Sequence, residues 1–397
     1  MIVLDDARNP YTPGAGAKPV ELVGRDAQLR AVETIAARTR RRLGSRSLML
    51  HGLRGVGKTV LLRELQRRLE GEDWLTVSVE AQADAGGSAQ VRRQLERGLV
   101  AGARRMQTRT DRFGSKLAVA LATISSFTIG LGVKLKIDLE PATGRADSGD
   151  LDFDLPELIA DVTPALHEAG TGFAVFVDEI QDLDPGTLAA LLTTQHQAAQ
   201  EGWPFCLFGA GLPSVPAVLA ESRSYAERQF EYHSIGRLDR GDAAEAFAGP
   251  ARQSGARYTR DALELLVEAT GGYPYFIQEY GAQTWRAATG PELITAEDAE
   301  LGANAGLEAL DHGFFLARWE RATKAEQRLM SAMADDGATS SALPDLVTRL
   351  GKKRQSDLSV ARRDLIAKGL VYAPARGELA FTVPHMAAYI QRRLDPA

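Results

Sequence analysis

One glycine-rich segment, residues 52–59, restricts the possible folds of this chain more than any other feature. It matches the pattern G-x-x-x-x-G-K-[ST] with Gly52, Leu53, Arg54, Gly55, Val56, Gly57, Lys58 and Thr59. A short apolar run at residues 47–51 precedes it, and a helical pattern continues from Lys58 to about residue 70. A strand, a glycine turn and a helix in this order predict a phosphate-binding loop, and a structural glycine turn is the alternative interpretation.

The chemistry of such a loop follows from its residue types. Glycines let backbone N–H groups wrap phosphate oxygens, and the new helix directs its partial positive charge at the same phosphates. Lys58 is expected to reach the β- and γ-phosphates of ATP and to act in catalysis, while the Thr59 hydroxyl is expected on Mg²⁺. The residues expected to hold the nucleotide here are Gly52, Arg54, Gly55, Val56, Gly57, Lys58, Thr59 and Val60.

A second apolar run, residues 173–177, ends in two carboxylates, Asp178 and Glu179. At a strand end beside the phosphate loop, Asp178 is expected near Mg²⁺, and Glu179 is expected to orient and deprotonate the attacking water. A solvated strand end is the alternative. Because Lys58 and Asp178 lie 120 positions apart, which is long for a compact nucleotide domain, the residues near 107–155 are interpreted as an insertion.

The insertion contains an ambiguous pattern. Residues 127–140 alternate apolar with small or polar side chains, a period of two that predicts a half-buried strand or a bent hairpin. Residues 117–133 carry no charge, but these 17 residues are marginal against the roughly 20 of a spanning helix. Since Asp5 and Asp6 also interrupt the apolar N-terminus, we expect neither a membrane span nor a signal peptide.

Composition narrows the class of protein. Hydrophobic residues make up 44% and charged residues 25% of the 397 residues, which is typical of a folded globular chain with a packed core. The one cysteine, Cys206, excludes intramolecular disulfides and cysteine-rich zinc sites. Its isolation predicts a reducing compartment, and therefore a cytoplasmic location.

Strand and helix patterns alternate up to about residue 238. Apolar runs predict strands at 47–51, 74–79, 173–177 and 205–208, and helical patterns lie between them at 58–70, 89–106, 155–169 and 187–200. This alternation predicts a three-layer α/β domain with a mostly parallel sheet. The expected organisation is an extended arm at 1–20, an α/β domain at 21–238, short helices at 239–313 and a C-terminal domain at 314–397.

Four motifs occur in one order along the chain: Leu22-Val23-Gly24-Arg25-Asp26, the segment 52–59, Val177-Asp178-Glu179-Ile180-Gln181, and Gly271-Gly272-Tyr273-Pro274. Together they resemble AAA+ ATPases of the origin-recognition/archaeal ATPase branch and the neighbouring STAND nucleotide switches, over about residues 21–310. The resemblance implies an AAA+-like P-loop NTPase that hydrolyses ATP with Mg²⁺ beneath a helical lid. It also implies Val23, Gly24 and Arg25 near the adenine, and Pro274 in the lid over the nucleotide.

Two departures from the AAA+ pattern bear on the rate of hydrolysis. The strand at 205–208 ends in Gly209-Ala210-Gly211, where such proteins usually carry a polar side chain. Tyr275 and Phe276, rather than an arginine, follow Pro274 in the lid motif. Both departures predict tight ATP binding with slow turnover, which suits a switch better than a motor.

By the same resemblance, the region of Arg223 and Arg228 holds an arginine finger, a residue that meets the nucleotide of a neighbouring subunit. Arg228 is the candidate catalytic residue, and Arg237 has a weaker claim. Self-association would follow from such a finger. A solvated arginine on a charged helix is the alternative for each of them.

The C-terminal residues 345–397 carry ten basic and five acidic side chains, although the whole chain has a net charge of −5. Helical patterns at 318–334, 343–350 and 357–368, followed by a hairpin at 370–383, predict a winged helix-turn-helix. The side chains expected to contact phosphates or guanine edges of duplex DNA are Lys352, Lys353, Arg354, Arg362 and Arg363. A module that packs within the chain or binds an unknown protein is the alternative, and both hypotheses stay open. A GTPase is disfavoured because no Asn-Lys-x-Asp base-reading motif is found.

Overall fold

The structure, a computed structural model, describes residues 5–14, 16–82, 87–108, 116–130, 144–290 and 292–394. The chain divides into two compact units. The sheet unit comprises Asp26–His51 and Leu61–Ser234. The lid unit comprises Met1–Arg25, Gly52–Val60 and Ile235–Ala397, so the phosphate loop belongs to it.

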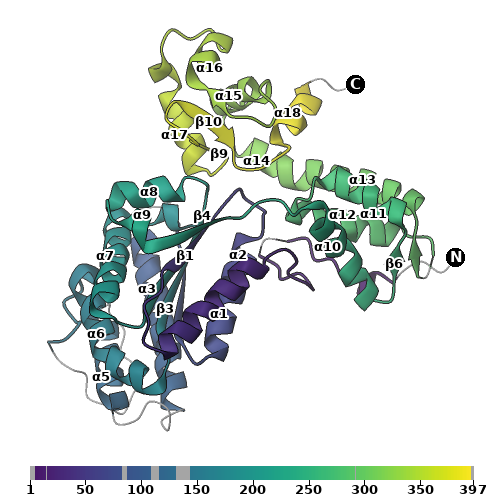
Figure 1. Cartoon of the computed structure of the whole chain (residues 1–397). Helices are drawn as coiled ribbons and strands as arrows, with labels where there is room; N and C mark the ends of the chain where they lie inside the picture. Colours follow the sequence, from purple (N-terminus) through teal and green to yellow (C-terminus); the bar gives the residue numbers. More distant parts are fainter. Residues whose placement is uncertain are drawn as a thin grey trace. The chain divides into compact units, whose positions relative to one another are not determined.

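Five parallel strands form the centre of the sheet unit (Figure 1). They are β1 (Ser47–His51), β2 (Leu75–Glu80), β3 (Phe173–Asp178), β4 (Phe205–Gly211) and β5 (Phe230–Ser234), in the order β2-β3-β4-β1-β5. All of β4 and nearly all of β1 and β3 are buried, as expected for strands covered on both faces. The four predicted strands are confirmed, and β5 was not predicted.

Helices cover both faces of this sheet because parallel strands need crossover connections. Figure 1 shows α1 (Asp26–Arg40) and α2 (Lys58–Gly71) along one face and α6 (Leu151–Ala169) and α7 (Pro185–Glu201) along the other. On the second face, α3 (Gly87–Gln107) and α5 (Leu117–Gly130) share one apolar core with strands β2, β3 and β4. The three-layer α/β fold is therefore confirmed.

The alternating pattern in the insertion led to a wrong prediction where the structure describes it. Residues up to Gly130 belong to α5 and not to a strand, while residues 131–140 lie outside the described residues. Leu121, Ile124 and Phe127 are buried at helical spacing against α3 and α6, so the helical period decides the structure of this stretch. No helix in the described part of the chain is long and apolar enough to cross a membrane.

The start of α6 also differs from prediction. The residues around 151–154 were expected in a loop, but the helix begins at Leu151 because the Asp150 side chain accepts a hydrogen bond from the Asp152 N–H. This is an N-terminal cap, which satisfies a backbone donor that the first helical turn leaves without a partner.

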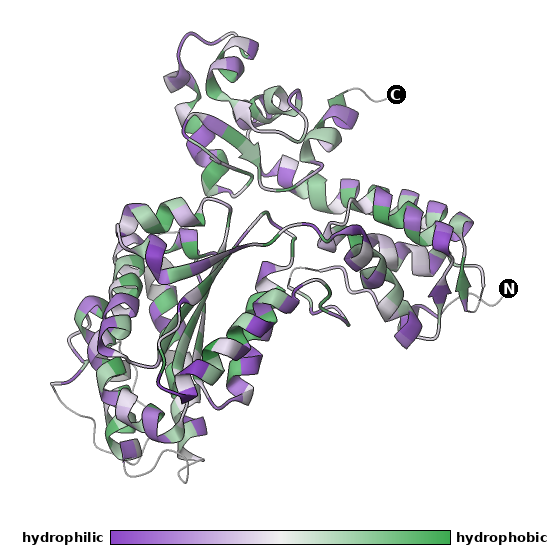
Figure 2. Ribbon diagram, in the orientation of Figure 1, coloured by the Kyte–Doolittle hydropathy of each residue, from purple (hydrophilic) through white to green (hydrophobic). Residues whose placement is uncertain are grey.

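Four helices form the first part of the lid unit: α10 (Arg240–Gln253), α11 (Arg260–Thr270), α12 (Pro274–Ala287) and α13 (Ala296–Ala309). Figure 2 shows hydrophobic and hydrophilic residues alternating along α13, as in an amphipathic helix. The short strands β6 (Arg257–Tyr258) and β7 (Leu293–Ile294) pair in parallel. The predicted series of short helices is confirmed.

The N-terminal segment is anchored to these helices. Tyr11 is buried, and its hydroxyl donates to the Phe247 carbonyl at 2.5 Å and lies 2.8 Å from the Tyr258 hydroxyl. The indole N–H of Trp285 donates to the Asp5 carbonyl at 3.0 Å. The segment expected as a simple extended arm is therefore part of the lid core.

The C-terminal part begins after a π-helical turn, Leu310–Phe315. Its helices are α14 (Leu316–Glu320), α15 (Lys324–Ala334), α16 (Leu343–Arg349), α17 (Ser359–Ala367) and α18 (Met386–Leu394). Strands β8 (Ser341–Ala342), β9 (Val371–Tyr372) and β10 (Glu378–Phe381) form a sheet in the order β8-β10-β9. From α15 to β10 the helices and the hairpin follow in the predicted order, and the winged helix-turn-helix stays a prediction.

Two details of this part were not predicted correctly. The single helix expected at 318–334 is interrupted, because Thr323 and Glu326 form a capping box that starts α15 separately. The final helix, α18, was missed.

Candidate nucleotide-binding site

Three glycines shape the phosphate loop, two through their backbone conformation and one through a close approach. Gly55 and Gly57 have φ angles of 85° and 90°, a region that residues with a side chain rarely adopt. A Cβ at Gly52 would lie 2.0 Å from the Ile235 carbonyl oxygen, so the chain can only pass this closely as glycine. A Cβ at Gly57 would meet nothing within 4 Å, which leaves open space on that side of the loop.

Lys58 is the first residue of α2 and is only 6% exposed. Its ammonium donates to the Gly52 carbonyl at 3.0 Å and to the Leu53 carbonyl at 2.8 Å. The cation is therefore held within the loop at the positive end of a helix. Positive-φ glycines, open space at Gly57, a helix N-terminus and an ammonium group together fit a polyphosphate.

The Arg25 side chain hydrogen-bonds the backbone of this loop. The side chain is 8% exposed, and its Nη2 donates to the Val56 carbonyl at 3.1 Å and to the Gly236 carbonyl at 2.8 Å. Burial lowers the pKa of the guanidinium, and the nearby Asp242 carboxylate opposes that change. The expectation that Arg25 lies near adenine is not tested, but its observed contacts are with the backbone.

The lid motif reaches the loop directly. The Tyr275 N–H donates to the Gly55 carbonyl at 3.2 Å, and a Cβ at Gly55 would lie 3.1 Å from the Tyr273 ring. Pro274 is the first residue of α12, a position where proline costs no hydrogen bond. The motif at 271–275 and the loop at 52–59 therefore contact each other.

The two carboxylates lie at the carboxyl edge of the sheet in the sheet unit. Asp178 is the last residue of β3, and Glu179 follows it in a left-handed conformation with φ 49° and ψ 44°. The Glu179 N–H donates to Asp178 Oδ1 at 3.0 Å. Both side chains are half-buried. Parallel α/β sheets bind ligands at this edge, so the position fits the expected roles.

Sequence reasoning missed Gln181, which connects two strands at this edge. Its Nε2 donates to Glu179 Oε2 at 2.8 Å, and its Oε1 accepts from the Leu212 N–H at 3.0 Å. A Cβ at Gly211 would lie 2.1 Å from Gln181 Oε1, so glycine at the end of β4 makes room for the amide. The glycines after residue 208 are the sequence signal that could have pointed to Gln181, because they leave space that a nearby polar side chain can fill.

The arginine-finger candidates occupy a short helix and its preceding turn. Arg228 is exposed in α9 (Ala226–Gln229), and Arg223 donates to the neighbouring Ser222 carbonyl at 3.1 Å. An exposed arginine is compatible both with an arginine finger and with a solvated side chain, so the arginine finger stays a prediction.

The basic residues of the C-terminal module are not equivalent. Lys352, Lys353 and Arg354 are exposed in the turn between α16 and α17. Arg363 pairs with Asp364 at 2.9 Å, and Arg362 is half-buried. The helix α17 also exposes two apolar side chains that were not predicted to matter, Val360 at 60% and Ile366 at 39%.

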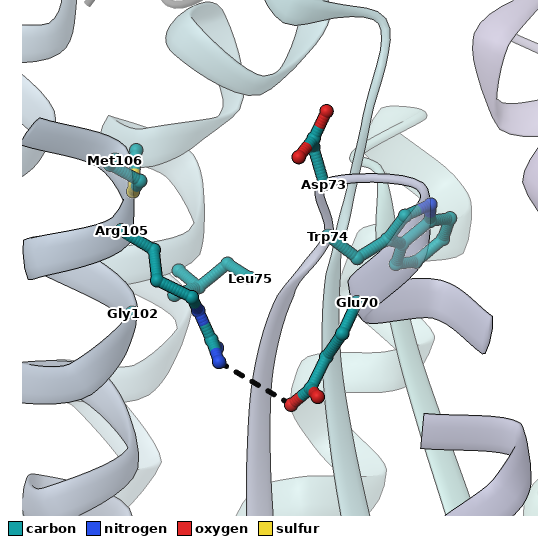
Figure 3. A pocket seen from close by; sticks show the side chains of 7 residues that line it. All are labelled: Glu70, Asp73, Trp74, Leu75, Gly102, Arg105 and Met106. Atoms are coloured by element: carbon teal, nitrogen blue, oxygen red, sulfur yellow. Dashed lines mark hydrogen bonds and ion pairs between the residues drawn. The ribbon is translucent and has the colours of Figure 1, made fainter. Parts of the chain in front are cut away.

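Two pockets lie at the opposite, amino-terminal edge of the sheet. The smaller, about 40 Å³, is lined by Trp74, Leu75 and Gly102 among others, and in it Arg105 pairs with Glu70 at 3.5 Å (Figure 3). The larger, about 280 Å³, is lined by the start of β4 and the turn before β1. Neither contains the residues at the carboxyl edge, so neither belongs to the predicted site.

The segment 52–59 has the backbone geometry of a phosphate-binding loop, and sequence comparison specifies the class of its domain. The AAA ATPase domain family matches residues 21–208, and a domain family of unknown function, DUF8462, matches residues 312–390. The chain accordingly contains an AAA ATPase domain at residues 21–208 and is an ATP hydrolase, and ATP with Mg²⁺ are the ligands of that domain family. None of the curated proteins matches the sequence.

Among solved structures that are similar at low sequence identity, one has a TM-score above 0.5 and supports the fold. The Walker-type ATPase PABY2304 of Pyrococcus abyssi has a TM-score of 0.60 and 16% identity, covering 94% of this chain and 97% of its own. Cdc6p of Pyrobaculum aerophilum has a TM-score of 0.48 and 16% identity, covering 99% and 98%. ORC1 of Aeropyrum pernix, solved in complex with DNA, has a TM-score of 0.44 and 15% identity, covering 95% and 94%.

Proposed function

We propose that this AAA+ ATPase is a nucleotide-dependent switch in which the phosphate loop controls the C-terminal winged helix. One contact carries this proposal: the Arg54 N–H in the loop donates to the Thr382 carbonyl, at the end of the β9–β10 hairpin, at 2.9 Å. Thr382 is fully buried, and its hydroxyl donates to the Gly369 carbonyl at 2.8 Å on the other side of the hairpin. A change in the conformation of the phosphate loop is therefore transmitted to the base of the β9–β10 hairpin.

The roles of the site residues form part of the same proposal. Backbone N–H groups of residues 52–60 and the Lys58 ammonium bind the phosphates of the substrate ATP. Thr59 and Asp178 are the proposed Mg²⁺ ligands, and the ion, when bound, neutralises charge on the transferred phosphoryl group. Glu179 is the proposed base for the attacking water. Val23, Gly24 and Arg25 lie by the adenine, and Pro274 lies in the lid over the nucleotide. Arg228 acts on a neighbouring subunit's nucleotide.

We propose that turnover is slow. The end of β4 offers glycine at 209 and 211, so no side chain from these positions can donate to the γ-phosphate or to the attacking water. Gly209 packs closely, because a Cβ there would lie 2.5 Å from Met49 Sδ. Slow hydrolysis prolongs the ATP-bound state, which is what a switch needs.

Duplex DNA is the proposed output ligand of the switch. The exposed side chains of Lys352, Lys353 and Arg354 support it, since a basic turn beside a recognition helix suits phosphate contacts. A protein partner is the second candidate, and the exposed Val360 and Ile366 on α17 favour it.

Salt-dependent fluorescence anisotropy separates these two outputs. A DNA complex should weaken with salt by a slope of about 0.9 for each phosphate contact. Arg362→Ala with Arg363→Ala should flatten the slope, whereas the control Arg240→Ala with Arg260→Ala, at exposed positions of the lid, should not. Absence of duplex binding at low salt with ATP present would favour the protein partner.

Hydrogen exchange of residues 369–383 tests the switch itself. We expect different protection of this hairpin with a non-hydrolysable ATP analogue and with ADP, and no such difference in Lys58→Ala. Identical exchange in both states, while calorimetry shows both nucleotides bound, would contradict the switch.

We also propose the domain organisation that the sequence predicts: an ATPase domain at 21–238, a lid at 239–313 and a winged helix at 314–397.

Burial raises the pKa of the Cys206 thiol to about 12, so this cysteine is unreactive. A lone inert thiol supports the proposed cytoplasmic location.

A further inference from the structure

We propose that Arg318, on the short helix α14 before the winged helix, binds the terminal phosphate of ATP and thereby distinguishes ATP from ADP. This inference rests on the proposed switch function, for which it names the sensing residue. It concerns the lid unit alone, since the phosphate loop, the lid motif and α14 all belong to that unit.

A chain of direct contacts leads from the loop to Arg318. The Tyr275 N–H donates to the Gly55 carbonyl at 3.2 Å. The Tyr275 ring stacks on Phe314, with ring centroids 4.6 Å apart and an interplanar angle of 27°. The Arg318 guanidinium carbon lies 3.7 Å from the Phe314 centroid. Stacked rings are stiff, so the guanidinium is held at a set position relative to the loop.

The surroundings of Arg318 suit an anion. Besides the stack, its Nη1 donates to the Phe314 carbonyl at 2.8 Å. Burial lowers the pKa of its guanidinium to about 10, and repulsion from Arg54 and Arg321 adds to this change. Two cations from different parts of the chain, one of them in the phosphate loop, are thus held close enough to repel. A multiply charged anion between them would remove that repulsion.

The terminal phosphate is the group such a cation would meet. The loop N–H groups and the start of α2 bind the inner, α- and β-phosphates, and Lys58 binds the β- and γ-phosphates. Arg54 lies before Lys58 and the start of α2 in the loop. We therefore expect a cation beside Arg54 to bind the outermost phosphate. The planar guanidinium can donate two parallel hydrogen bonds to one phosphate. The lid motif itself supplies no arginine, because Tyr275 and Phe276 follow Pro274.

The helix α14, which carries Arg318, is also linked to the winged helix, through the arginine that follows the helix. The nearby Arg321 donates to the Lys368 carbonyl at 3.4 Å, at the end of α17. Lys368 in turn pairs at 2.6 Å with Glu326, a carboxylate that is only 3% exposed. A phosphate held by Arg318 would therefore fix the position of α14 and of the helices that follow. The π-helical turn at Leu310–Phe315, a rare element often found at functional sites, gives α14 its position.

Calorimetric titration of the full chain tests the assignment with two probes, a non-hydrolysable ATP analogue and ADP. In Arg318→Gln, affinity for the triphosphate should fall about 10- to 100-fold, and affinity for ADP should stay within about twofold. Arg318→Lys should show a smaller loss with the same selectivity, because it keeps the charge but not the planar fork. Arg328→Gln, at an exposed position of α15, is the matched control and should change neither affinity.

Hydrogen exchange gives a second readout, which a purely structural arginine would not affect. With the ATP analogue bound, the hairpin 369–383 of Arg318→Gln should exchange as the ADP-bound wild type does. Equal losses for both nucleotides, or no loss in either variant, would overturn the assignment. If Arg318→Gln fails to fold, Arg318→Lys decides alone. Failure of the wild type to bind either nucleotide would instead contradict the proposed function.

Discussion

Replacing Gln181 by alanine tests how the Glu179 carboxylate is oriented. The substitution removes the bond from Nε2 to Glu179 Oε2, of 2.8 Å, and the bond from the Leu212 N–H, of 3.0 Å. A hydrogen bond to a charged group contributes about 1.5–3 kcal/mol, and about 1.4 kcal/mol corresponds to a factor of ten in rate. If most of this energy serves to orient the base, kcat should fall by about 10- to 100-fold.

The affinity for ATP should stay unchanged, since the observed bonds of Gln181 are to Glu179 and Leu212 and not to the phosphate loop. Steady-state phosphate release gives kcat, and calorimetry with a non-hydrolysable analogue gives the dissociation constant. The exposed Gln200 on α7 provides a matched control, Gln200→Ala, that should leave both quantities unchanged.

A second substitution reaches the same interaction from the other strand. A Cβ at Gly211 would lie 2.1 Å from Gln181 Oε1, so Gly211→Ala should displace the amide and lower kcat similarly. An unchanged kcat in Gln181→Ala, or a loss of ATP affinity with kcat preserved, would refute the role given to Gln181.

Three further predictions concern the base, the N-terminal anchor and pH. Glu179→Gln should retain ATP binding while phosphate release falls by about 100-fold or more; turnover equal to wild type would exclude Glu179 as the base. Tyr11→Phe should lower the free energy of unfolding in urea by about 1–3 kcal/mol, because the hydroxyl bonds to the Phe247 carbonyl and to Tyr258; an unchanged midpoint would contradict the anchor. Burial lowers the pKa of His167 below its unfolded value of 6.5, and the nearby charge of Arg42 adds to this change. As the pH drops below 6.5, the unfolded chain therefore binds the proton before the folded chain does. The free energy of unfolding should fall in that range. His167→Gln should reduce that fall, as measured by urea unfolding at several pH values.

Local sequence signals predicted the parts of the site that are local in the chain. The strand at 47–51, the loop and the start of α2 follow one another directly, so spacing alone predicted them. Asp178 and Glu179 were singled out because they end an apolar strand downstream of a phosphate loop, although strands often end in acidic residues. The family comparison confirms the class of enzyme that these signals indicated.

The parts that were not predicted depend on contacts between distant segments. The hydrogen bonds of Arg25 to the backbone carbonyls at positions 56 and 236 were not predicted, and its place near adenine stays a prediction. Gln181 owes its position to space left by Gly211 on another strand. Arg318 lies far along the chain from the phosphate loop, and an aromatic stack relates the two. No local pattern encodes such pairings.

The helix α5 shows the opposite failure, in which a local pattern misled. Alternation that starts at Phe127 predicted a strand, yet Phe127 is the last of several buried residues at helical spacing that pack against α3 and α6. The apolar core of the sheet unit thus selected the helical period over the period of two.

Calorimetric titration of the wild-type chain with Mg-ATP tests the central claim most directly. We expect one nucleotide bound per chain, with affinity reduced about tenfold or more in Lys58→Ala, whose ammonium lies within the phosphate loop. Absence of binding by the wild type, or equal affinity in Lys58→Ala, would contradict it.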